Sequence, residues 1–341
     1  MDPCSSAQDV PLCDYCETTI VHSYCGLCHL SLCKPCVVGH TSDGNDKHTI
    51  VPLQERRSTL IDLKCKTELL DEPELVATIQ TGYEELRSVA CLKDGSIWTS
   101  GLTKDIKCFN IEGSLLQTIK QKSGDFPNHI AVDKDGNLLY ISDEIKTVYK
   151  VRNGQTEELI RIPSKWTPRR LCVTSTGDLL VTMFSDDYTQ SKVVRYSGST
   201  EKQTIQFDDE GKPLYSGNGE LLYVTENRNH DICVADINAR AVVVVNQDSK
   251  LRWRYCGRPT VTKKGPFELF GITTDSQSHI LTADVFNHCI HILDQDGHFL
   301  RYIDNCDLKN PYDLCLDNNE NLFVCEIFKG NVKKIKYMYP K

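Results

Sequence analysis

Six cysteines and two histidines near the N-terminus have the spacing of zinc ligands. Three Cys-x-x-Cys pairs are followed by the two histidines, and the set comprises Cys13, Cys16, Cys25, Cys28, Cys33, Cys36, His40 and His48. Two thiolates from such a turn can bind one ion, and a structural zinc site is tetrahedral with four sulfur or nitrogen ligands. Eight ligands therefore predict two structural zinc ions. Because the segment is short and polar, metal binding would supply most of its folding free energy.

The sequence around these ligands resembles the B-box zinc finger of the tripartite-motif proteins. The resemblance covers residues 12–53 and is carried, in order, by LCDYC, SYCGLC, LCKPC, GH and KH. In that family the ligand pairs interleave between two ions. The resemblance implies one zinc on Cys13, Cys16, Cys33 and Cys36, and a second zinc on Cys25, Cys28, His40 and His48. We therefore expect a B-box-type domain over residues 8–53.

The rest of the chain favours a cytoplasmic location without a membrane span. No apolar run approaches the roughly 18 residues of a membrane-spanning helix, and the N-terminus lacks the basic start and apolar stretch of a signal peptide. Thiols stay reduced in the cytoplasm, so a disulfide knot is disfavoured at the N-terminus. Eight further cysteines are expected to be buried core thiols: Cys91, Cys108, Cys172, Cys233, Cys256, Cys289, Cys315 and Cys325.

Residues 54–74 predict a linker or one short helix. The segment is charged, and Pro73 lies near its end. The tripartite proteins carry a long coiled coil at this point, which needs several heptads of apolar positions, and the segment is too short to provide them. Only twelve residues precede Cys13, so we expect no RING domain either. The oligomeric state therefore stays open.

From residue 75 onward the sequence predicts a six-bladed β-propeller. Asp94-Gly95, Asp135-Gly136 and Thr176-Gly177 are turn pairs spaced 41 residues apart, and a repeat near 40 residues with short strands is typical of propeller blades. Strands following such turns give six copies: SIWTSG, NLLYISD, DLLVTMF, DICVADI, HILTADV and NLFVCEI. The last copy lacks an outer strand, which residues 75–80 (LVATIQ) would supply, closing the ring. The expected class is mainly β, with a propeller domain over residues 75–341.

The fifth copy, HILTADVFNHCIHILDQDGHFLRYI at residues 279–303, resembles the NHL repeat. In tripartite proteins this repeat forms a six-bladed propeller, and the resemblance spans residues 75–338. Together with the B-box it implies a shortened protein of the TRIM-NHL type, similar to the sets expanded in bivalve molluscs. Full-length members are RING-type ubiquitin ligases, which implies a link to ubiquitination. Without a RING domain we expect no intrinsic enzyme activity.

Loops at one end of a propeller are the expected place for a protein partner, because function usually lies on loops. Aromatic residues on these loops are the candidate partner-binding residues: Trp166, Phe184, Tyr188, Phe267, Phe286, Tyr312 and Phe328. Aromatic side chains beside charges suit a protein or peptide partner. The alternative is that half or more of them pack between blades.

Two other functions compete with protein binding. Arg169, Arg170, Lys263 and Lys264, with Trp166 for stacking, would suit an RNA-binding regulator, although the net charge of −8 disfavours a partner as acidic as nucleic acid. Some six-bladed propellers are metal-dependent hydrolases, which need carboxylate or histidine ligands in the channel. Acidic residues at strand ends, Asp143, Asp236, Asp284 and Glu326, fit backbone hydrogen bonding better than a metal ring. No catalytic constellation is evident, so a zinc-containing interaction protein is the leading hypothesis.

Overall fold

A computed structural model describes the fold of two compact units, Met1–Lys66 and Thr67–Lys341. The residues that it describes are 13, 16, 23–25, 31–42, 50–52, 69–121, 126–163, 165–217, 221–257 and 265–339. Within these ranges, no helix has the length and apolar character to cross a bilayer.

The N-terminal unit contains a small antiparallel sheet and one helix. Strand β1 (Ser23–Cys25) lies between β2 (Ser31–Leu32) and β3 (Ile50–Pro52). Helix α1 (Lys34–Ser42) begins two residues after β2. Leu32 is fully buried against Cys13 and Cys33. In the described part of this unit, the buried apolar residues are Cys13, Leu32 and Cys33.

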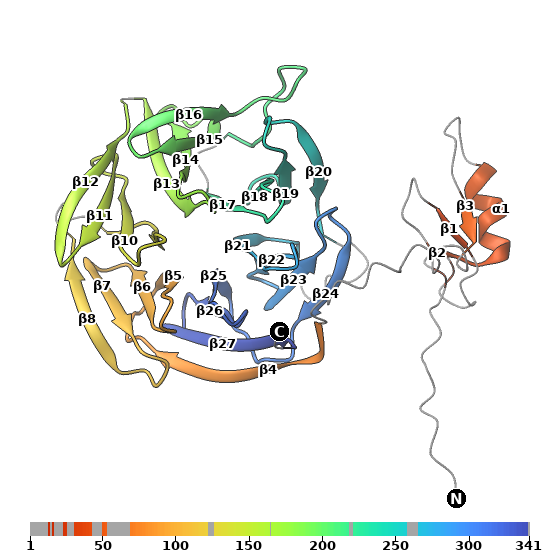
Figure 1. Ribbon diagram of the computed structural model, residues 1–341. Coiled ribbons are helices and arrows are strands. Elements are labelled where there is room, and N and C mark those ends of the chain that lie inside the picture. Colours follow the sequence, from red (N-terminus) through yellow and green to blue (C-terminus); the bar gives the residue numbers. More distant parts are fainter. Residues whose placement is uncertain are drawn as a thin grey trace, which may run out of the picture. The chain divides into compact units, whose positions relative to one another are not determined.

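The second unit is a six-bladed β-propeller in the described residues, which confirms the predicted fold class (Figure 1). Each blade is a four-stranded antiparallel sheet. Blade 1 contains β5 (Leu86–Cys91), β6 (Ile97–Gly101), β7 (Asp105–Phe109) and β8 (Leu115–Lys120); blade 2 contains β9 (Ile130–Val132), β10 (Leu138–Ser142), β11 (Thr147–Arg152) and β12 (Gln155–Arg161); blade 3 contains β13 (Trp166–Val173), β14 (Leu179–Ser185), β15 (Ser191–Ser197) and β16 (Thr200–Ile205).

The remaining three blades follow the same order along the chain. Blade 4 contains β17 (Leu222–Glu226), β18 (Ile232–Asp236), β19 (Ala241–Val245) and β20 (Leu251–Tyr255); blade 5 contains β21 (Leu269–Thr274), β22 (Ile280–Asp284), β23 (Cys289–Leu293) and β24 (Phe299–Ile303); blade 6 contains β25 (Pro311–Leu316), β26 (Leu322–Glu326), β27 (Asn331–Met338) and β4 (Leu69–Gln80). The first strand of each blade lies innermost and the last lies outermost (Figure 1).

The sequence explains this layering. The second strand of each blade is buried along its whole length, as expected for apolar runs covered on both faces. The outer strand β8, in contrast, is exposed at five of its six positions. The predicted turns at Gly95, Gly136 and Gly177 join first to second strands, and all three glycines adopt the left-handed conformation, with φ of 85–89°.

Strand β4 closes the ring, as predicted from LVATIQ. It pairs antiparallel with β27, with Ile79 opposite Val332 and Leu69 opposite Met338. The strand begins at Leu69, inside the segment expected to be a linker. Pro73, which suggested the end of that linker, lies where the β4–β27 register is irregular, and a proline is tolerated at such a break. The carbonyl oxygen of Asp71 accepts a hydrogen bond from Arg301 of β24 (2.8 Å), so β4 also contacts blade 5.

Most of the scattered cysteines are core thiols, but three depart from that expectation. Cys108, Cys233, Cys289 and Cys325 are buried and Cys172 is half-buried. Cys256 is exposed, because it directly follows the outer strand β20. Cys91 and Cys315 form a disulfide, because ring closure brings the first and last blades together.

Candidate metal centre and binding face

Four cysteines of the N-terminal unit converge on one point. The sulfur atoms of Cys13, Cys16, Cys33 and Cys36 all lie within 4.8 Å of one another. Helix α1 positions part of the set, because Cys33 precedes its first residue and Cys36 lies in its first turn. Four convergent thiols that form no disulfide suit tetrahedral zinc, with no position left open for a substrate. These are the four residues that the resemblance to the B-box assigns to the first zinc ion.

The second zinc ion remains a prediction. Cys28 and His48 lie outside the described residues. Cys25 ends β1 and His40 belongs to α1, but their side chains lie outside the described part. The geometry of the structure thus supports a metal centre at the first four cysteines. The second zinc site is supported only by the spacing of its ligands in the sequence.

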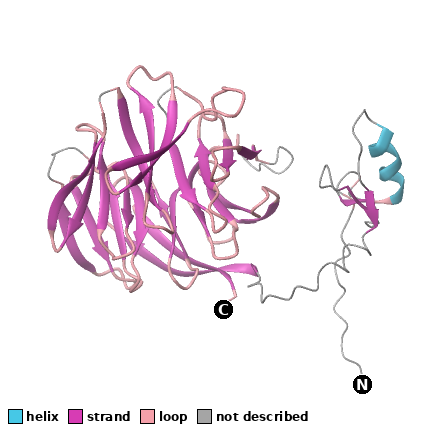
Figure 2. Ribbon diagram, turned by 45° about the horizontal axis from the view of Figure 1, so that its top comes forward, coloured by secondary structure: helices cyan, strands magenta, loops and turns pink. Residues whose placement is uncertain are grey.

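Exposed apolar side chains on the connecting loops lie at one end of the propeller. Figure 2 shows connecting loops at both ends of the propeller. Strands alternate in direction, so the loops between second and third strands and those between blades lie at the same end. Among the described residues, every large apolar loop residue that is exposed lies at this end: Leu102, Phe126, Tyr188, Phe207, Phe286 and Phe328. We call this set the aromatic face.

Three of the seven candidate partner-binding residues belong to the aromatic face. Tyr188, Phe286 and Phe328 are 54%, 50% and 64% exposed, each in a loop between the second and third strands. Tyr188 adopts a left-handed conformation with φ of 60°, which is uncommon for a residue with a bulky side chain and is held only by its surroundings. Its ring stacks on Phe184, with centroids 5.2 Å apart.

The other four candidates contribute mainly to packing. Phe184, Phe267 and Tyr312 are buried, with at most 7% of their surface exposed, because their rings fill the space between neighbouring strands and loops. Trp166 is half-buried, and the Lys192 ammonium lies 4.1 Å from its ring centroid. Sequence alone does not distinguish these residues from the exposed three, since all seven occur at similar places in the repeat.

The candidate RNA-binding arginines are engaged within the propeller. Arg169 donates a hydrogen bond to Asp143 (2.7 Å) and lies over the ring of Phe184. Arg170 is 2% exposed and points into the channel, because a register shift between Pro168 and Arg170 changes the direction of the side chains in β13. Lys263 and Lys264 lie outside the described residues.

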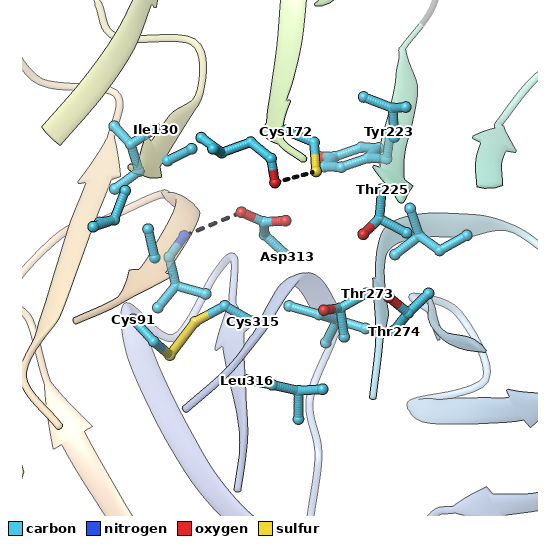
Figure 3. A pocket seen from close by; sticks show the side chains of 18 of the residues that line it. Cys91, Ile130, Cys172, Tyr223, Thr225, Thr273, Thr274, Asp313, Cys315 and Leu316 are labelled. Carbon is cyan, nitrogen blue, oxygen red and sulfur yellow. Dashed lines mark hydrogen bonds between the residues drawn. A yellow bond between two sulfur atoms is a disulfide. The ribbon is translucent and has the colours of Figure 1, made fainter. Parts of the chain in front are cut away.

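The central channel contains a buried polar cluster of Ser88, His129, Arg170, Tyr223 and Asp313. Arg170 donates hydrogen bonds to the Tyr223 hydroxyl (3.0 Å) and to the Asn128 carbonyl (2.8 Å). Asp313 accepts hydrogen bonds from the Ser88 hydroxyl (2.8 Å) and the Val89 amide (3.1 Å). The cluster adjoins a cavity of about 470 Å³ between the innermost strands (Figure 3). Sequence analysis missed this cluster, since its members come from five different blades.

The channel cluster does not have the geometry of a nucleophilic triad. The Leu171 amide donates to His129 Nδ1 (3.3 Å), so the imidazole proton lies on Nε2, which is 3.5 Å from Asp313. Ser88 donates to the carboxylate and not to the imidazole. His129 therefore has no free lone pair to accept a proton from Ser88, as a triad requires. The hydrogen bonds fix the inner strands to one another.

We expect this cluster to make the propeller less stable in acid. Burial lowers the pKa of His129 below its ordinary value of 6.5. Below that pH the unfolded chain binds more protons at this site than the folded chain, so stability falls as pH is lowered. Burial disfavours the charged form of Asp313, but His129 and its hydrogen-bond donors hold the pKa of Asp313 below its ordinary value of 3.8. The stability that ionised Asp313 contributes is therefore also lost as the pH falls, but at a lower pH than for His129.

Thermal unfolding measured between pH 7 and pH 5 checks this prediction. We expect His129→Asn to show a smaller loss of Tm over this interval than the parent chain, because asparagine can accept the Leu171 hydrogen bond without titrating. Val76→Ala, at a half-exposed residue that does not titrate, is the control and should retain the parent's dependence. An unchanged pH dependence in His129→Asn would contradict the assignment.

A second group of metal-ligating residues lies in blade 5. Ligand atoms of Asp284, Cys289 and His291 are within 4.8 Å of one another, and all three residues are buried. Asp284 accepts hydrogen bonds from Asn287 Nδ2 (2.8 Å) and from His291 (3.2 Å), while Tyr255 contacts the other imidazole nitrogen at 3.0 Å. These bonds give the group a structural role between blades 4 and 5.

The acidic residues at strand ends act mainly through hydrogen bonds. The Ala239 amide donates to Asp236 and the Asn287 amide donates to Asp284, as expected for turn residues. From the sequence, the four acidic residues were expected at equivalent strand ends, and the strand pairing corrects this for Asp143. Asp236 pairs with Ala241 and Asp284 with Cys289, whereas Ser142 occupies this place in blade 2 and Asp143 is one residue later.

Comparison with known proteins shows the fold of the second unit. No protein-family profile matches the chain, and no curated protein matches it in sequence. A gluconolactonase from Xanthomonas campestris is 14% identical with a TM-score of 0.59, covering 79% of this chain and 95% of that one. Virginiamycin B lyase from Staphylococcus aureus is 11% identical with a TM-score of 0.53, covering 78% and 99%.

A third similar structure is a calcium-binding protein, regucalcin, from Agrobacterium tumefaciens. It is 10% identical with a TM-score of 0.61, and covers 78% of this chain and 96% of that one. At these identities the likeness shows the propeller fold alone and does not extend to activity.

Proposed function

We propose that this chain is a cytoplasmic, zinc-containing interaction protein that combines a B-box with an NHL-type propeller, and that the aromatic face binds a protein partner. The observation that carries the proposal is the gathering of exposed aromatic side chains at one end of the propeller. Among the described residues, the loops at the opposite end have no exposed large apolar side chain, and the exposed aromatic residue at that end is Tyr339, which directly follows β27. Exposed apolar patches of this kind mark interaction sites.

The chemistry of the aromatic face suits a protein partner. Phe286 and Phe328 project from the loops of neighbouring blades 5 and 6, and exposed Lys329 follows Phe328 directly. Aromatic anchors rimmed by charged groups are the usual composition of protein interfaces. The arginines that would suit RNA are instead bound to Asp143 or buried in the channel, so we favour protein over RNA.

The channel supports a hydrolase less well. The propeller's structural neighbours include a gluconolactonase, and a hydrolase of that class would need ligands free to bind a metal ion in the channel. Here Asp313 already accepts hydrogen bonds from Ser88 and Val89, and the Arg170 guanidinium supplies a positive charge in the same cluster. These contacts favour a binding protein over an enzyme.

We expect a double variant, Phe286→Ser with Phe328→Ser, to lose partner binding. Removing two exposed anchors should reduce binding about 10-fold or more, while stability changes little because both side chains are half exposed. Leu115→Ser with Leu116→Ser is the matched control, since these leucines are 54% and 56% exposed but lie on the outer strand β8.

The measurement is affinity purification of the three proteins from cytoplasmic extract, followed by mass spectrometry and titration of any captured protein. A protein retained by the parent and the control, but lost by the double variant, supports the proposal. Equal loss in the control, or RNA crosslinking that survives in all three proteins without a protein partner, would count against it. A ubiquitination assay on the same samples tests the link to ubiquitin transfer.

A further inference from the structure

Two cysteines lie side by side where the first and last blades meet. Cys91 ends β5 and Cys315 lies near the end of β25, with Cα atoms 6.2 Å apart and a disulfide between them. That Cα separation is within the range of native disulfides. The two residues are 224 positions apart in the chain, so the bond encloses all of the intervening blades in one covalent loop.

This pair occurs only at the junction that closes the ring. Cys315 pairs with Phe323, the second residue of the second strand in blade 6. Cys91 pairs with Ile97, the first residue of the second strand in blade 1. Each other junction can therefore be compared by the same two positions. At the other five junctions of the described propeller the corresponding pairs are Ala90 and Val132, Ala131 and Val173, Cys172 and Glu226, Thr225 and Thr274, and Thr273 and Leu316. A covalent bond between sulfur atoms is thus available only where the two ends of the propeller meet.

The pair is accessible from the central cavity. Cys91 and Cys315 are both half-buried and line the cavity of about 470 Å³ (Figure 3). The same cavity extends to Arg228, Asn318 and Glu320 in the loops beyond the innermost strands, at the end opposite the aromatic face. A small oxidant or reductant can reach the sulfur atoms by this route, and access is what makes a disulfide labile.

We propose that Cys91 and Cys315 are a reversible redox site that locks the propeller ring. Hydrogen peroxide oxidises one thiolate to a sulfenic acid and is reduced to water. The second thiol then displaces the sulfenic oxygen as a second water, which leaves the disulfide. A dithiol reverses the bond by exchange and is itself oxidised to a disulfide. With the bond formed, closure of the ring no longer depends on the β4–β27 pairing alone.

Cys172 provides an internal comparison. It lines the same cavity, but its counterpart at the junction is Glu226 and it forms no disulfide. Burial raises the pKa of Cys172 to about 11, which keeps its thiolate scarce near neutral pH. Selective oxidation of the pair over Cys172 is therefore expected.

The test uses the purified full chain, reduced with a phosphine and then exposed to hydrogen peroxide. Peptide mapping by mass spectrometry should show a Cys91–Cys315 linkage that forms with peroxide and disappears on renewed reduction. Thermal unfolding should show a Tm higher by roughly 5–10 °C in the oxidised form, since the bond constrains a long loop of the unfolded chain. Cys172→Ser should retain this shift, and Cys315→Ser and Cys91→Ala should abolish it.

Three results would overturn the proposal. A linkage that resists reduction in the folded chain would make the bond a permanent structural one. Peroxide that modifies Cys172 in preference to the pair would show that the cavity does not direct oxidation to Cys91 and Cys315. Failure of the parent chain to form the linkage would refute the site directly, whatever the variants do.

Discussion

Replacing Cys33 with serine is expected to release zinc and unfold the N-terminal unit while the propeller stays folded. Cys33 is buried and its sulfur lies 3.7 Å from that of Cys16, so its loss removes a ligand from the centre of the site. Metal binding contributes on the order of 10–16 kcal/mol to folding of small zinc domains. That exceeds the stability of a unit this size, at about 0.1 kcal/mol per residue.

Elemental analysis and limited proteolysis measure the effect. We expect the Cys33→Ser chain to lose at least one zinc ion and to be cleaved before residue 67, with residues beyond it resistant. Cys256→Ser is the matched control, since Cys256 is an exposed cysteine of the propeller and should retain the parent's zinc content. A Cys33→Ser chain with the parent's zinc content would refute the ligand assignment.

Removing residues 67–80 is expected to abolish stable folding of the propeller under reducing conditions. Blade 6 would lose its outer strand, which exposes the unpaired edge of β27, and Ile79 would no longer fill the core between blades. An exposed edge of this kind favours aggregation. Reducing conditions matter because the Cys91–Cys315 bond joins blade 6 to blade 1, the blade that follows β4 in the chain.

Two point variants test the same closure more gently. Ile79→Ala, at a fully buried position, should cost about 2–5 kcal/mol, while Val76→Ala, which is 51% exposed on the same strand, should change stability by less than about 1 kcal/mol. Denaturant unfolding of the full chain measures both. Equal effects of the two variants would show that β4 does not close the ring through Ile79.

The sequence predicted most of the fold because the propeller repeats a local pattern. Each copy carries its own turn and its own apolar second strand, so six weak signals at one spacing define six blades. Closure by β4 was also predictable, since a final blade without an outer strand requires one from elsewhere in the chain. The first residues of β4 were missed because Asp71, Glu72 and Pro73 suggest a linker. Hydrogen bonds from Arg301 to the Asp71 carbonyl and from Asn305 to the Pro73 carbonyl hold them in place.

The candidate site was predicted unevenly for a physical reason. Cysteine ligands have a fixed short spacing, so Cys13, Cys16, Cys33 and Cys36 were identified from sequence and the structure brings them together. The partner of Cys91 lies 224 residues away, and no local pattern indicates it. Burial of the loop aromatics likewise depends on the neighbouring blade, which is why Phe267 and Phe286, close in sequence, end with 6% and 50% exposure.

The position of β4 has a mechanical consequence. The chain from the N-terminal unit enters the propeller at Leu69, the first residue of the strand that closes the ring. Tension applied through the zinc-binding unit would therefore load the Leu69 end of β4 first. The residue pairs between β4 and β27 would then separate one after another. The disulfide encloses residues 91–315 and bears none of that load on β4. Under such tension, the strand that closes the ring would therefore be loaded before the rest of the propeller.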